Sequence, residues 1–267
     1  MAGTTAPRSG PSAGTPGEPS AVVILHGIGV SHRYSDRLQE ELSDSRLTLS
    51  FDLPGFAGTP RPPRPFSVAD HSEVVAAALD ARGLSGCTVV GHSMGVQFAL
   101  ELALRRPDLV GALVLIGPVT DPARPTAWQQ ALDLAADTFC EPLGTNAIVV
   151  TDYLRTGVRW FFTELGPMLT YPTTEAVAAV QAPVLVVRGS RDPIARAPWC
   201  RELAAVAADG RLLEVRGHGH VVQRSAARTV AASIEQFAAE YEHPHGQAPV
   251  HGPAQAHRPE RAAGVHG

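Results

Sequence analysis

Short apolar runs alternate with amphipathic stretches through the centre of the chain, whereas both ends are polar and rich in small residues. A short apolar run bounded by Gly, Pro, Asp or Ser is typical of a strand that is buried on both faces. The runs that fit this description, and that we expect to be strands, are residues 21–25, 47–52, 87–90, 112–116, 184–188 and 211–215.

The segments between these runs carry apolar residues at helical spacing, which predicts helices over residues 70–82, 96–105, 198–208 and 226–241. Strands that alternate with helices in this way form parallel sheets whose crossover helices cover both faces. The predicted fold class is therefore α/β, with a mostly parallel central sheet.

The same pattern predicts one folded domain over residues 21–241, flanked by disordered tails over residues 1–20 and 242–267. The second tail is rich in His, Pro and Gly, and its irregular histidine spacing favours a solvated tail over a metal site. Within the domain, residues 120–182 separate two strands by far more than the roughly 2 to 6 residues usual for such a loop. We expect this segment to be a helical lid insertion.

Composition limits the class of ligand. The chain has 267 residues, 44% of them hydrophobic, and a formal net charge of -4, so a positive field for binding nucleic acid is absent. The sequence contains no lysine, which excludes catalysis through a lysine Schiff base. We expect a small-molecule substrate and no nucleic-acid partner, and the sequence leaves the oligomeric state open.

The cysteines and apolar segments bear on location and cofactors. Cys87, Cys140 and Cys200 are odd in number and widely spaced, so they predict neither a disulfide framework nor a zinc site. We found no signal-peptide pattern and no apolar run near the roughly 18 residues of a membrane helix, so the expected location is the cytoplasm, without membrane attachment. No motif implies a metal or an organic cofactor.

The most informative motif is Gly91-His92-Ser93-Met94-Gly95, a G-x-S-x-G sequence between an expected strand and an expected helix. In that context the motif is typical of a nucleophile elbow, a sharp turn that presents a serine hydroxyl. A serine is a weak nucleophile unless a histidine takes its proton and an acid orients that histidine. Ser93 is thus the candidate nucleophile, and it requires two partners.

Both partners can be found at the ends of later strands. Asp192 follows the strand at 184–188, and His218 and His220 follow the strand at 211–215. In open parallel sheets, ligand chemistry concentrates at these carboxyl ends. The chain order of serine, acid and histidine is also the one found in enzymes with a G-x-S-x-G elbow on such a sheet.

Residues 21–241 resemble the α/β-hydrolase superfamily, in its serine-nucleophile, lid-containing form, through the elbow, the acid loop and the Gly217-His218-Gly219-His220 turn. The resemblance implies a Ser93, Asp192, His220 triad, with His218 the less favoured base. Some relatives carry the acid one strand earlier, which makes Asp121 a competing orienting residue that we rank below Asp192.

The resemblance also implies an oxyanion hole. The His26-Gly27-Ile28-Gly29 segment follows the first strand, as does the His-Gly loop of similar enzymes, so the backbone N–H groups of Ile28 and Met94 would be the donors. The turn at 52–58 is similar to a structural turn of the family, and we interpret it as support for the end of a strand.

The expected insertion is rich in aromatic residues, which can line an apolar pocket or can pack the insertion onto the core. They are Trp128, Phe139, Tyr153, Trp160, Phe161, Phe162 and Tyr171. The leading hypothesis is a cofactor-independent serine hydrolase of an ester, lactone or thioester with a small, largely apolar substrate.

Other functions remain open on the same scaffold, because a fold does not fix a reaction. A biosynthetic acyl transferase, cyclase or lyase of bacterial natural-product metabolism is the main alternative. A carbon–carbon bond hydrolase and a ligand receptor are weaker alternatives.

Overall fold

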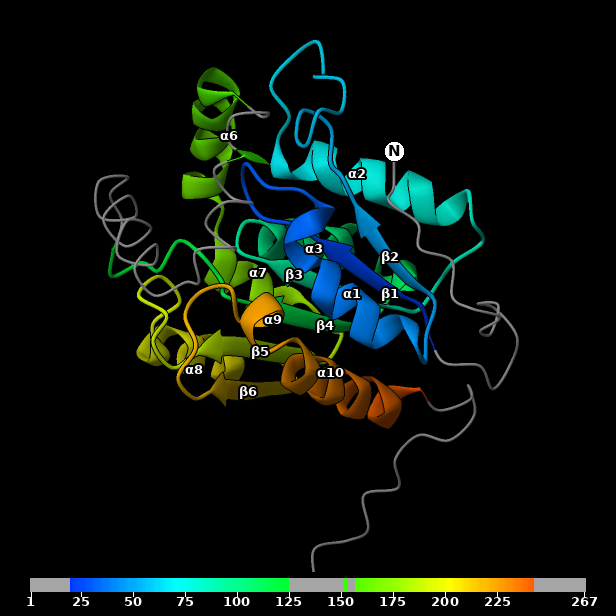
Figure 1. Ribbon diagram of the computed structural model, residues 1–267, viewed down its shortest axis with the longest axis vertical. Coiled ribbons are helices and arrows are strands. Elements are labelled where there is room, and N and C mark those ends of the chain that lie inside the picture. Colours follow the sequence, from blue (N-terminus) through cyan, green and yellow to red (C-terminus); the bar gives the residue numbers. More distant parts are fainter. Residues whose placement is uncertain (1–19, 125–150, 153–156, 243–267) are drawn as a thin grey trace, which may run out of the picture.

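The apolar runs form one six-stranded sheet in which every neighbouring pair of strands is parallel (Figure 1). The computed structural model describes residues 20–124, 151–152 and 157–242. The strands are β1 Val22–Leu25, β2 Thr48–Phe51, β3 Cys87–His92, β4 Val110–Ile116, β5 Val184–Gly189 and β6 Gly210–Val215, in the spatial order β2-β1-β3-β4-β5-β6. This arrangement confirms the predicted α/β fold class.

Helices lie on both faces of the sheet and enclose two hydrophobic clusters (Figure 1). α2, α3, α7 and α8 contact one another in turn around one cluster, and α1, α9 and α10 gather around the other. Their bounds are α1 Asp36–Ser43, α2 Val68–Asp80, α3 Gly95–Arg105, α6 Val158–Thr170, α7 Thr173–Ala179, α8 Ala197–Val206, α9 Val222–Ser225 and α10 Ala227–Tyr241, with short 3-10 turns η1 His32–Ser35 and η2 Pro107–Leu109.

The strands of the sheet differ in burial. Every residue of β1, β2, β3 and β5 is buried, as continuous apolar runs predict. β6 lies at the edge of the sheet and is partly exposed along most of its length. The expectation of coverage on both faces is therefore wrong for β6, whereas β2, at the opposite edge of the sheet, is buried throughout.

The helix α2 begins two residues before its expected start because of its cap. The Ser67 hydroxyl accepts the Asp70 N–H at 3.1 Å, and the Asp70 carboxylate accepts the Ser67 N–H at 2.8 Å. This reciprocal pair is a capping box, which satisfies two N–H groups that the first turn leaves without partners. The helix therefore starts at Val68.

The expected insertion, residues 120–182, lies partly outside the described residues, and its role as a lid stays a prediction. Within its described part, α6 turns Trp160, Glu164 and Met168 toward the core at intervals of one helical turn. Glu164 Oε2 lies 3.1 Å from His71 Nε2 of α2, and both side chains are fully buried. The Gln97 amide of α3 donates to the Met168 carbonyl at 2.9 Å.

The turn after β2 supports α6, in agreement with the structural interpretation of residues 52–58. Gly55 has a φ of +85°, and a Cβ there would lie 2.4 Å from Trp160 Nε1. Only glycine combines this backbone conformation with such a close approach. The turn therefore supplies a flat surface on which the indole ring packs.

The two ends of the described chain meet at the amino-terminal edge of the sheet. The Ser20 N–H donates to Glu242 Oε1 at 3.0 Å, and the buried Arg46 guanidinium pairs with both Glu235 and Glu242. The predicted tails, apart from Ser20 and Glu242, lie outside the described residues. Among the helices of the described part, none has the length and hydropathy needed to cross a bilayer.

The close packing at the carboxyl end of β5 predicts that a side chain at Gly189 would destabilise the protein. A Cβ at Gly189 would lie 2.2 Å from the carbonyl oxygens of both His218 and Gly219, whereas a Cβ at Gly166, on the exposed side of α6, would meet nothing within 4 Å. We expect Gly189→Ala to lower the free energy of unfolding by about 2 kcal/mol or more. Gly166→Ala should leave it unchanged or raise it by about 0.5–1 kcal/mol. Urea denaturation of both variants measures this, and equal effects would contradict the packing argument.

Candidate active site

The candidate site lies where the strand order reverses, between β1 and β3. Chain segments leave these two strands toward opposite faces of the sheet, and the crevice between them is where ligands bind in open α/β folds. Gly27, just after β1, lies against Ser93, just after β3: a Cβ at Gly27 would be 2.9 Å from Ser93 Cβ and 3.3 Å from its Oγ. The predicted oxyanion loop and the predicted nucleophile are therefore adjacent.

Backbone packing explains the glycines of the G-x-S-x-G motif. A Cβ at Gly91 would lie 2.3 Å from the Gly95 carbonyl oxygen, and a Cβ at Gly95 would lie 2.2 Å from the Leu25 carbonyl oxygen. Ser93 between them has a φ of +56°, a left-handed conformation that costs a non-glycine residue about 1–2 kcal/mol. The turn is held in place by the Ser93 N–H, which donates to the Ile116 carbonyl at 2.9 Å. Ser93 thus occupies a strained turn between a strand and a helix.

The predicted oxyanion donors flank this turn. Met94 precedes the first residue of α3, where the backbone N–H groups have no partner within the helix and carry partial positive charge. Within the described ranges, neither the Met94 N–H nor the Ile28 N–H donates a backbone hydrogen bond. Neither group is therefore committed to a backbone acceptor within these ranges, as the predicted oxyanion role requires.

His26 holds the oxyanion loop, a role that the sequence does not reveal. Its Nδ1 lies 2.8 Å from the Gly27 carbonyl oxygen, and its Nε2 accepts the Leu53 N–H at 3.1 Å. Burial lowers the pKa of His26 below its usual value, so the ring is neutral and donates through Nδ1. The ring therefore ties the loop after β1 to the turn after β2.

The acid and the histidine meet across the ends of β5 and β6. Asp192 Oδ2 lies 2.9 Å from His220 Nδ1, and Asp192 Oδ1 accepts the N–H groups of Ile194 and Ala195 at 2.8 and 2.9 Å. Burial raises the pKa of Asp192, but the nearby charge of His220 and these hydrogen bonds outweigh it, so the pKa is lower than usual. Asp192 is thus an ionised, fixed acceptor for the His220 Nδ1–H.

A buried arginine supports the acid loop and is a second residue that the sequence does not reveal. The Arg188 Nε donates to the Ala195 carbonyl at 2.7 Å, and its guanidinium also reaches the Asp192 carbonyl at 3.3 Å. Arg188 is the penultimate residue of β5 and pairs with Glu214 of β6. The side chain therefore holds the loop that carries Asp192 at two carbonyl groups, one of them that of Asp192 itself.

The structure brings His220, rather than His218, to the acid. His218 Nδ1 lies 2.9 Å from the Ser225 hydroxyl, away from Asp192. The His220 ring packs on the backbone after β4: a Cβ at Gly117 would lie 2.8 Å from His220 Cε1. Because Ile116, the preceding residue, accepts the Ser93 N–H, the serine and the histidine converge on the same strand end.

His92, beside the nucleophile, supports the histidine loop. Its ring centroid lies 4.8 Å from that of His220, and its Nε2 donates to the His220 carbonyl oxygen at 3.2 Å. Burial, together with the charge of His220, lowers the pKa of His92 to about 3. His92 therefore stays neutral near neutral pH and fixes the backbone of His220.

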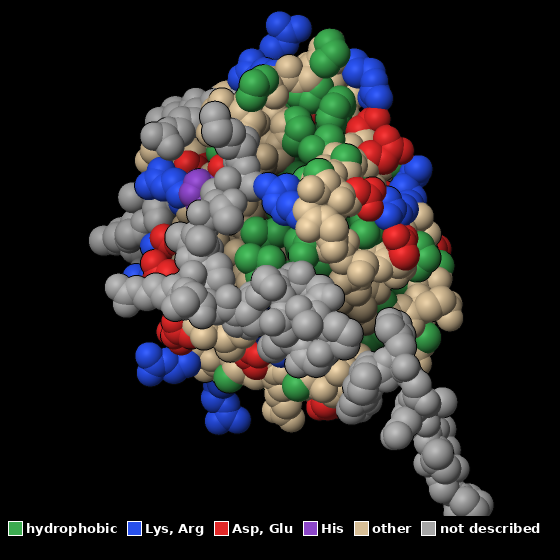
Figure 2. Space-filling view, turned by 90° about the vertical axis from the view of Figure 1, so that its right-hand side faces the viewer, with side chains coloured by type: hydrophobic (Ala, Val, Ile, Leu, Met, Phe, Trp, Pro, Cys, Tyr) green, Lys and Arg blue, Asp and Glu red, His purple; other side chains and the backbone are tan. Residues whose placement is uncertain are grey.

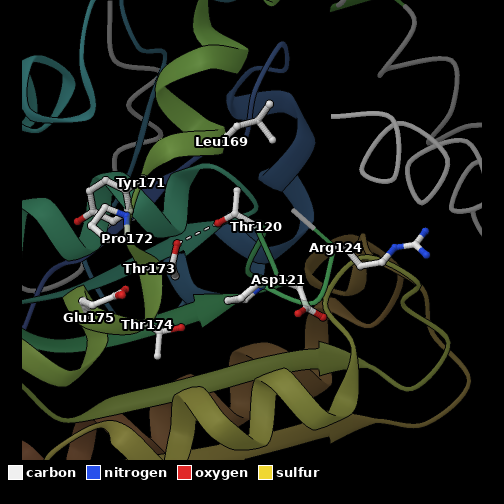
Figure 3. Close-up of a pocket in the computed structure, with 10 residues that line it drawn as sticks. Thr120, Asp121, Arg124, Leu169, Tyr171, Pro172, Thr173, Thr174 and Glu175 are labelled. Carbon is white, nitrogen blue, oxygen red and sulfur yellow. Dashed lines mark hydrogen bonds between the residues drawn. The ribbon is translucent and has the colours of Figure 1, made fainter. Parts of the chain in front are cut away.

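The competing acid, Asp121, has other partners. Its Oδ2 accepts from Arg196 Nε and Nη2 at 3.0 and 2.7 Å, and its Oδ1 accepts the Ala123 N–H at 2.8 Å. It borders a small pocket beyond β4 (Figure 3), where the Thr120 and Thr173 hydroxyls lie 3.1 Å apart. Asp121 therefore pairs with Arg196, whereas Asp192 pairs with His220.

The aromatic residues of the expected insertion differ in their surroundings. Trp160 is buried, Tyr171 donates to the Glu101 carboxylate at 3.1 Å, and Phe162 is 63% exposed. Trp128, Phe139 and Tyr153 lie outside the described residues. The described rings therefore include both core contacts and exposed surface, and Tyr171 also lines the pocket beside Asp121.

Within the described residues, neither the charged side chains nor the cysteines form a second candidate functional site. Acidic and basic side chains intermingle with hydrophobic ones on the face shown in Figure 2. Burial raises the pKa of Cys87 and of Cys200 to about 12, so both thiols are unreactive, and Cys140 lies outside the described residues. No group of three potential metal ligands occurs in the described ranges.

The depressed pKa of His92 predicts a pH dependence of stability. The folded protein binds a proton at His92 only near pH 3, whereas the unfolded chain binds it near the ordinary value of 6.5. The contribution of His92 to the free energy of unfolding is complete above pH 6.5. It is lost as the pH falls, by up to about 1.4 kcal/mol per pH unit. His92→Gln, which keeps an N–H donor but cannot titrate, should make this loss shallower in urea denaturation over the same window.

His32 provides the opposite control. Its hydrogen bond to Asp52 raises its pKa, so its contribution is present at lower pH and is lost as the pH rises through the folded-state pKa. Because this contribution is complete below the unfolded-state pKa of 6.5, His32→Gln should leave the acid-side loss unchanged and should remove a loss of stability that occurs as the pH rises above 6.5. Identical pH profiles for both variants and the wild type would refute these assignments.

Known proteins resemble this chain in sequence and in fold. Residues 20–141 match the family described as alpha/beta hydrolase fold, and residues 167–249 match the family described as TAP-like protein. Lipase LipV of Mycobacterium tuberculosis is 33% identical over 134 residues, which are 49% of this chain and 50% of the lipase. The chain thus spans about half the length of that curated relative.

Solved structures agree over a larger share of the chain. A thermophilic esterase from Thermogutta terrifontis has a TM-score of 0.72 and 17% identity, covering 87% of this chain and 97% of the esterase. The enol-lactonase from Burkholderia xenovorans LB400 has a TM-score of 0.70 and 19% identity, covering 83% of this chain and 92% of the lactonase. The two family matches show that the chain belongs to the α/β-hydrolase superfamily, and the parallel sheet and the solved structures agree with them in fold.

Proposed function

We propose that this protein is a serine hydrolase that cleaves an ester, lactone or thioester of a small, largely apolar substrate. The observation that carries the proposal is the 2.9 Å contact between Asp192 and His220, at strand ends that also hold Ser93 in its strained turn. An acid fixed on one nitrogen of an imidazole leaves the other nitrogen as a base for a nearby hydroxyl.

Acylation follows from this arrangement. Ser93 Oγ attacks the substrate carbonyl carbon while His220 Nε2 takes the hydroxyl proton, and Asp192 stabilises the imidazolium through Nδ1–H. The tetrahedral intermediate then collapses: the bond to the leaving oxygen or sulfur breaks, and His220 returns the proton to that atom. The product of this half-reaction is an acyl ester of Ser93.

Deacylation repeats these steps with water. His220 Nε2 accepts a proton from water as its oxygen attacks the acyl carbon, and the proton then passes to Ser93 Oγ as the ester bond breaks. The enzyme is restored and the free acid leaves. The two half-reactions as written require no metal or organic cofactor.

In this proposal the backbone N–H groups of Ile28 and Met94 donate hydrogen bonds to the oxyanion of both tetrahedral intermediates. Two features support this assignment: the loop after β1 lies against Ser93, and Met94 stands at the amino terminus of α3. Donors that are already fixed stabilise developing charge without reorganisation, and deleting one donor costs about 10²–10³-fold in kcat.

The proposed substrate class is supported by the names of similar proteins. Proteins similar to this chain are named as a lipase, an esterase and an enol-lactonase. Their common chemistry is attack on an acyl carbon that bears an oxygen leaving group. We therefore favour small, largely apolar acyl substrates, with a small molecule as the only partner that the reaction requires.

Active-site labelling tests the nucleophile. A fluorophosphonate probe phosphonylates an activated serine with loss of fluoride, so wild-type protein should gain one adduct in intact-mass spectrometry. The adduct should be absent in Ser93→Ala and in His220→Ala. Labelling of Ser93→Ala at the wild-type rate would refute the nucleophile assignment, and acyl transfer to an added alcohol without free acid would replace hydrolysis by transfer.

A matched pair of aspartate variants tests the acid. Asp192→Asn should lower kcat for p-nitrophenyl butyrate by about 10³–10⁴-fold, because the amide no longer holds the reactive tautomer of His220. Asp121→Asn removes another buried carboxylate, one that contacts Arg196, and it should change kcat far less. His218→Gln is the corresponding control for His220. A larger loss in Asp121→Asn than in Asp192→Asn would reverse the assignment.

A further inference from the structure

Three consecutive residues beyond the oxyanion loop each contact a carboxylate. The Ser31 hydroxyl donates to Asp152 Oδ2 at 2.5 Å, and Arg33 Nη1 lies 3.7 Å from Asp152 Oδ1. Between them, the backbone N–H and the Nδ1 of His32 contact the Asp52 carboxylate at 2.8 and 2.7 Å. Two acids from distant parts of the chain therefore hold one short segment.

The two acids belong to different parts of the fold. Asp52 directly follows β2 and is part of the sheet framework. Asp152 belongs to the long segment between β4 and β5, and it is 121 positions from Ser31 in the sequence. The segment after Ile28 is thus fixed to the sheet through one acid and to the expected insertion through the other.

The Asp152 contact is costly for a purely structural residue. Asp152 is fully buried and Ser31 is 1% exposed, so both were removed from water on folding. Within the described residues Asp152 Oδ1 accepts no hydrogen bond, and its cationic neighbour Arg33 is 42% exposed and 3.7 Å away. A buried carboxylate with so few partners stabilises a fold poorly, and apolar replacements are often neutral or better.

The contact lies where it can control the oxyanion hole. Ile28 stands between two fixed points: His26 and Gly27, which are held by the His26 ring, and Ser31, which is held by Asp152. A loop fixed at both ends presents its N–H groups in one direction, and catalysis by such donors depends on that direction within a fraction of an ångström.

We propose that Asp152 is a positioning residue for the oxyanion donor Ile28, acting through the Ser31 hydroxyl. The proposal rests on the proposed hydrolase function and adds to it a link from the expected insertion to the oxyanion hole. The carboxylate does not touch the reacting atoms. It holds the loop so that the Ile28 N–H is aimed at the oxygen of the tetrahedral intermediate.

Variants of the two contacting residues test the proposal by steady-state kinetics with p-nitrophenyl butyrate. Asp152→Ala and Ser31→Ala should each lower kcat by about 10- to 100-fold, less than deletion of a donor. KM should change by less than about threefold, since the loop acts mainly on the transition state. The double variant should be no worse than the worse single variant, because both changes remove the same contact.

A conservative variant separates the hydrogen bond from the charge. Asp152→Asn keeps an oxygen that accepts from Ser31, so its kcat should lie within about threefold of wild type and well above that of Asp152→Ala. The matched control is Glu164→Gln, which alters another fully buried carboxylate between β4 and β5, one that contacts His71 instead of the oxyanion loop. It should lower the melting temperature while kcat stays within about threefold of wild type.

Distinct outcomes overturn the two proposals. Additive losses in the double variant, a rise in KM with unchanged kcat, or equal loss of kcat in Glu164→Gln would refute the positioning role of Asp152. Stoichiometric fluorophosphonate labelling of Ser93 in Asp152→Ala would show that the hydrolase proposal survives that result. Loss of labelling in a folded wild-type protein would instead remove the hydrolase proposal itself.

Discussion

The close approach of α3 to β1 and β3 is the constraint on which the candidate site depends. The Gly95 Cα is so near the Leu25 carbonyl oxygen that a methyl group would lie 2.2 Å from it, and a methyl group at Gly91 would lie 2.3 Å from the Gly95 carbonyl oxygen. This contact brings the amino terminus of α3 into the crevice between the strands. The candidate nucleophile, the helix dipole and the loop after β1 can meet there only because two backbones touch without side chains between them.

The sequence predicts the framework of the fold well because local patterns encode it. The apolar runs predict the bounds of each strand within a few residues, and the glycines around Ser93 predict the turn. The helix α1 was missed because it is short and mostly polar: Leu38 and Leu42 are its buried apolar residues, too few for a recognisable period. Local pattern is therefore sufficient where many neighbouring residues share one environment.

The supporting polar residues could not be predicted in the same way. His26, His92 and Arg188 each act on a backbone group whose position is set by the tertiary fold, and the hydrogen bond of His92 spans 128 positions. The expected insertion joins the core through similar long-range contacts, such as the one between Glu164 and His71. Such buried contacts add little net stability, but they allow only one arrangement of the joined segments. A single sequence contains the residues but not their pairing.

The left-handed backbone of Ser93 sets the fold and the chemistry in conflict at one position. Glycine adopts a φ of +56° without strain, so a chain with glycine at this position would fold to a protein more stable by about 1 kcal/mol. Selection for stability alone would replace this serine. A serine at this position therefore costs the fold stability that a glycine would recover, and the proposed nucleophile role gives a chemical reason for that cost.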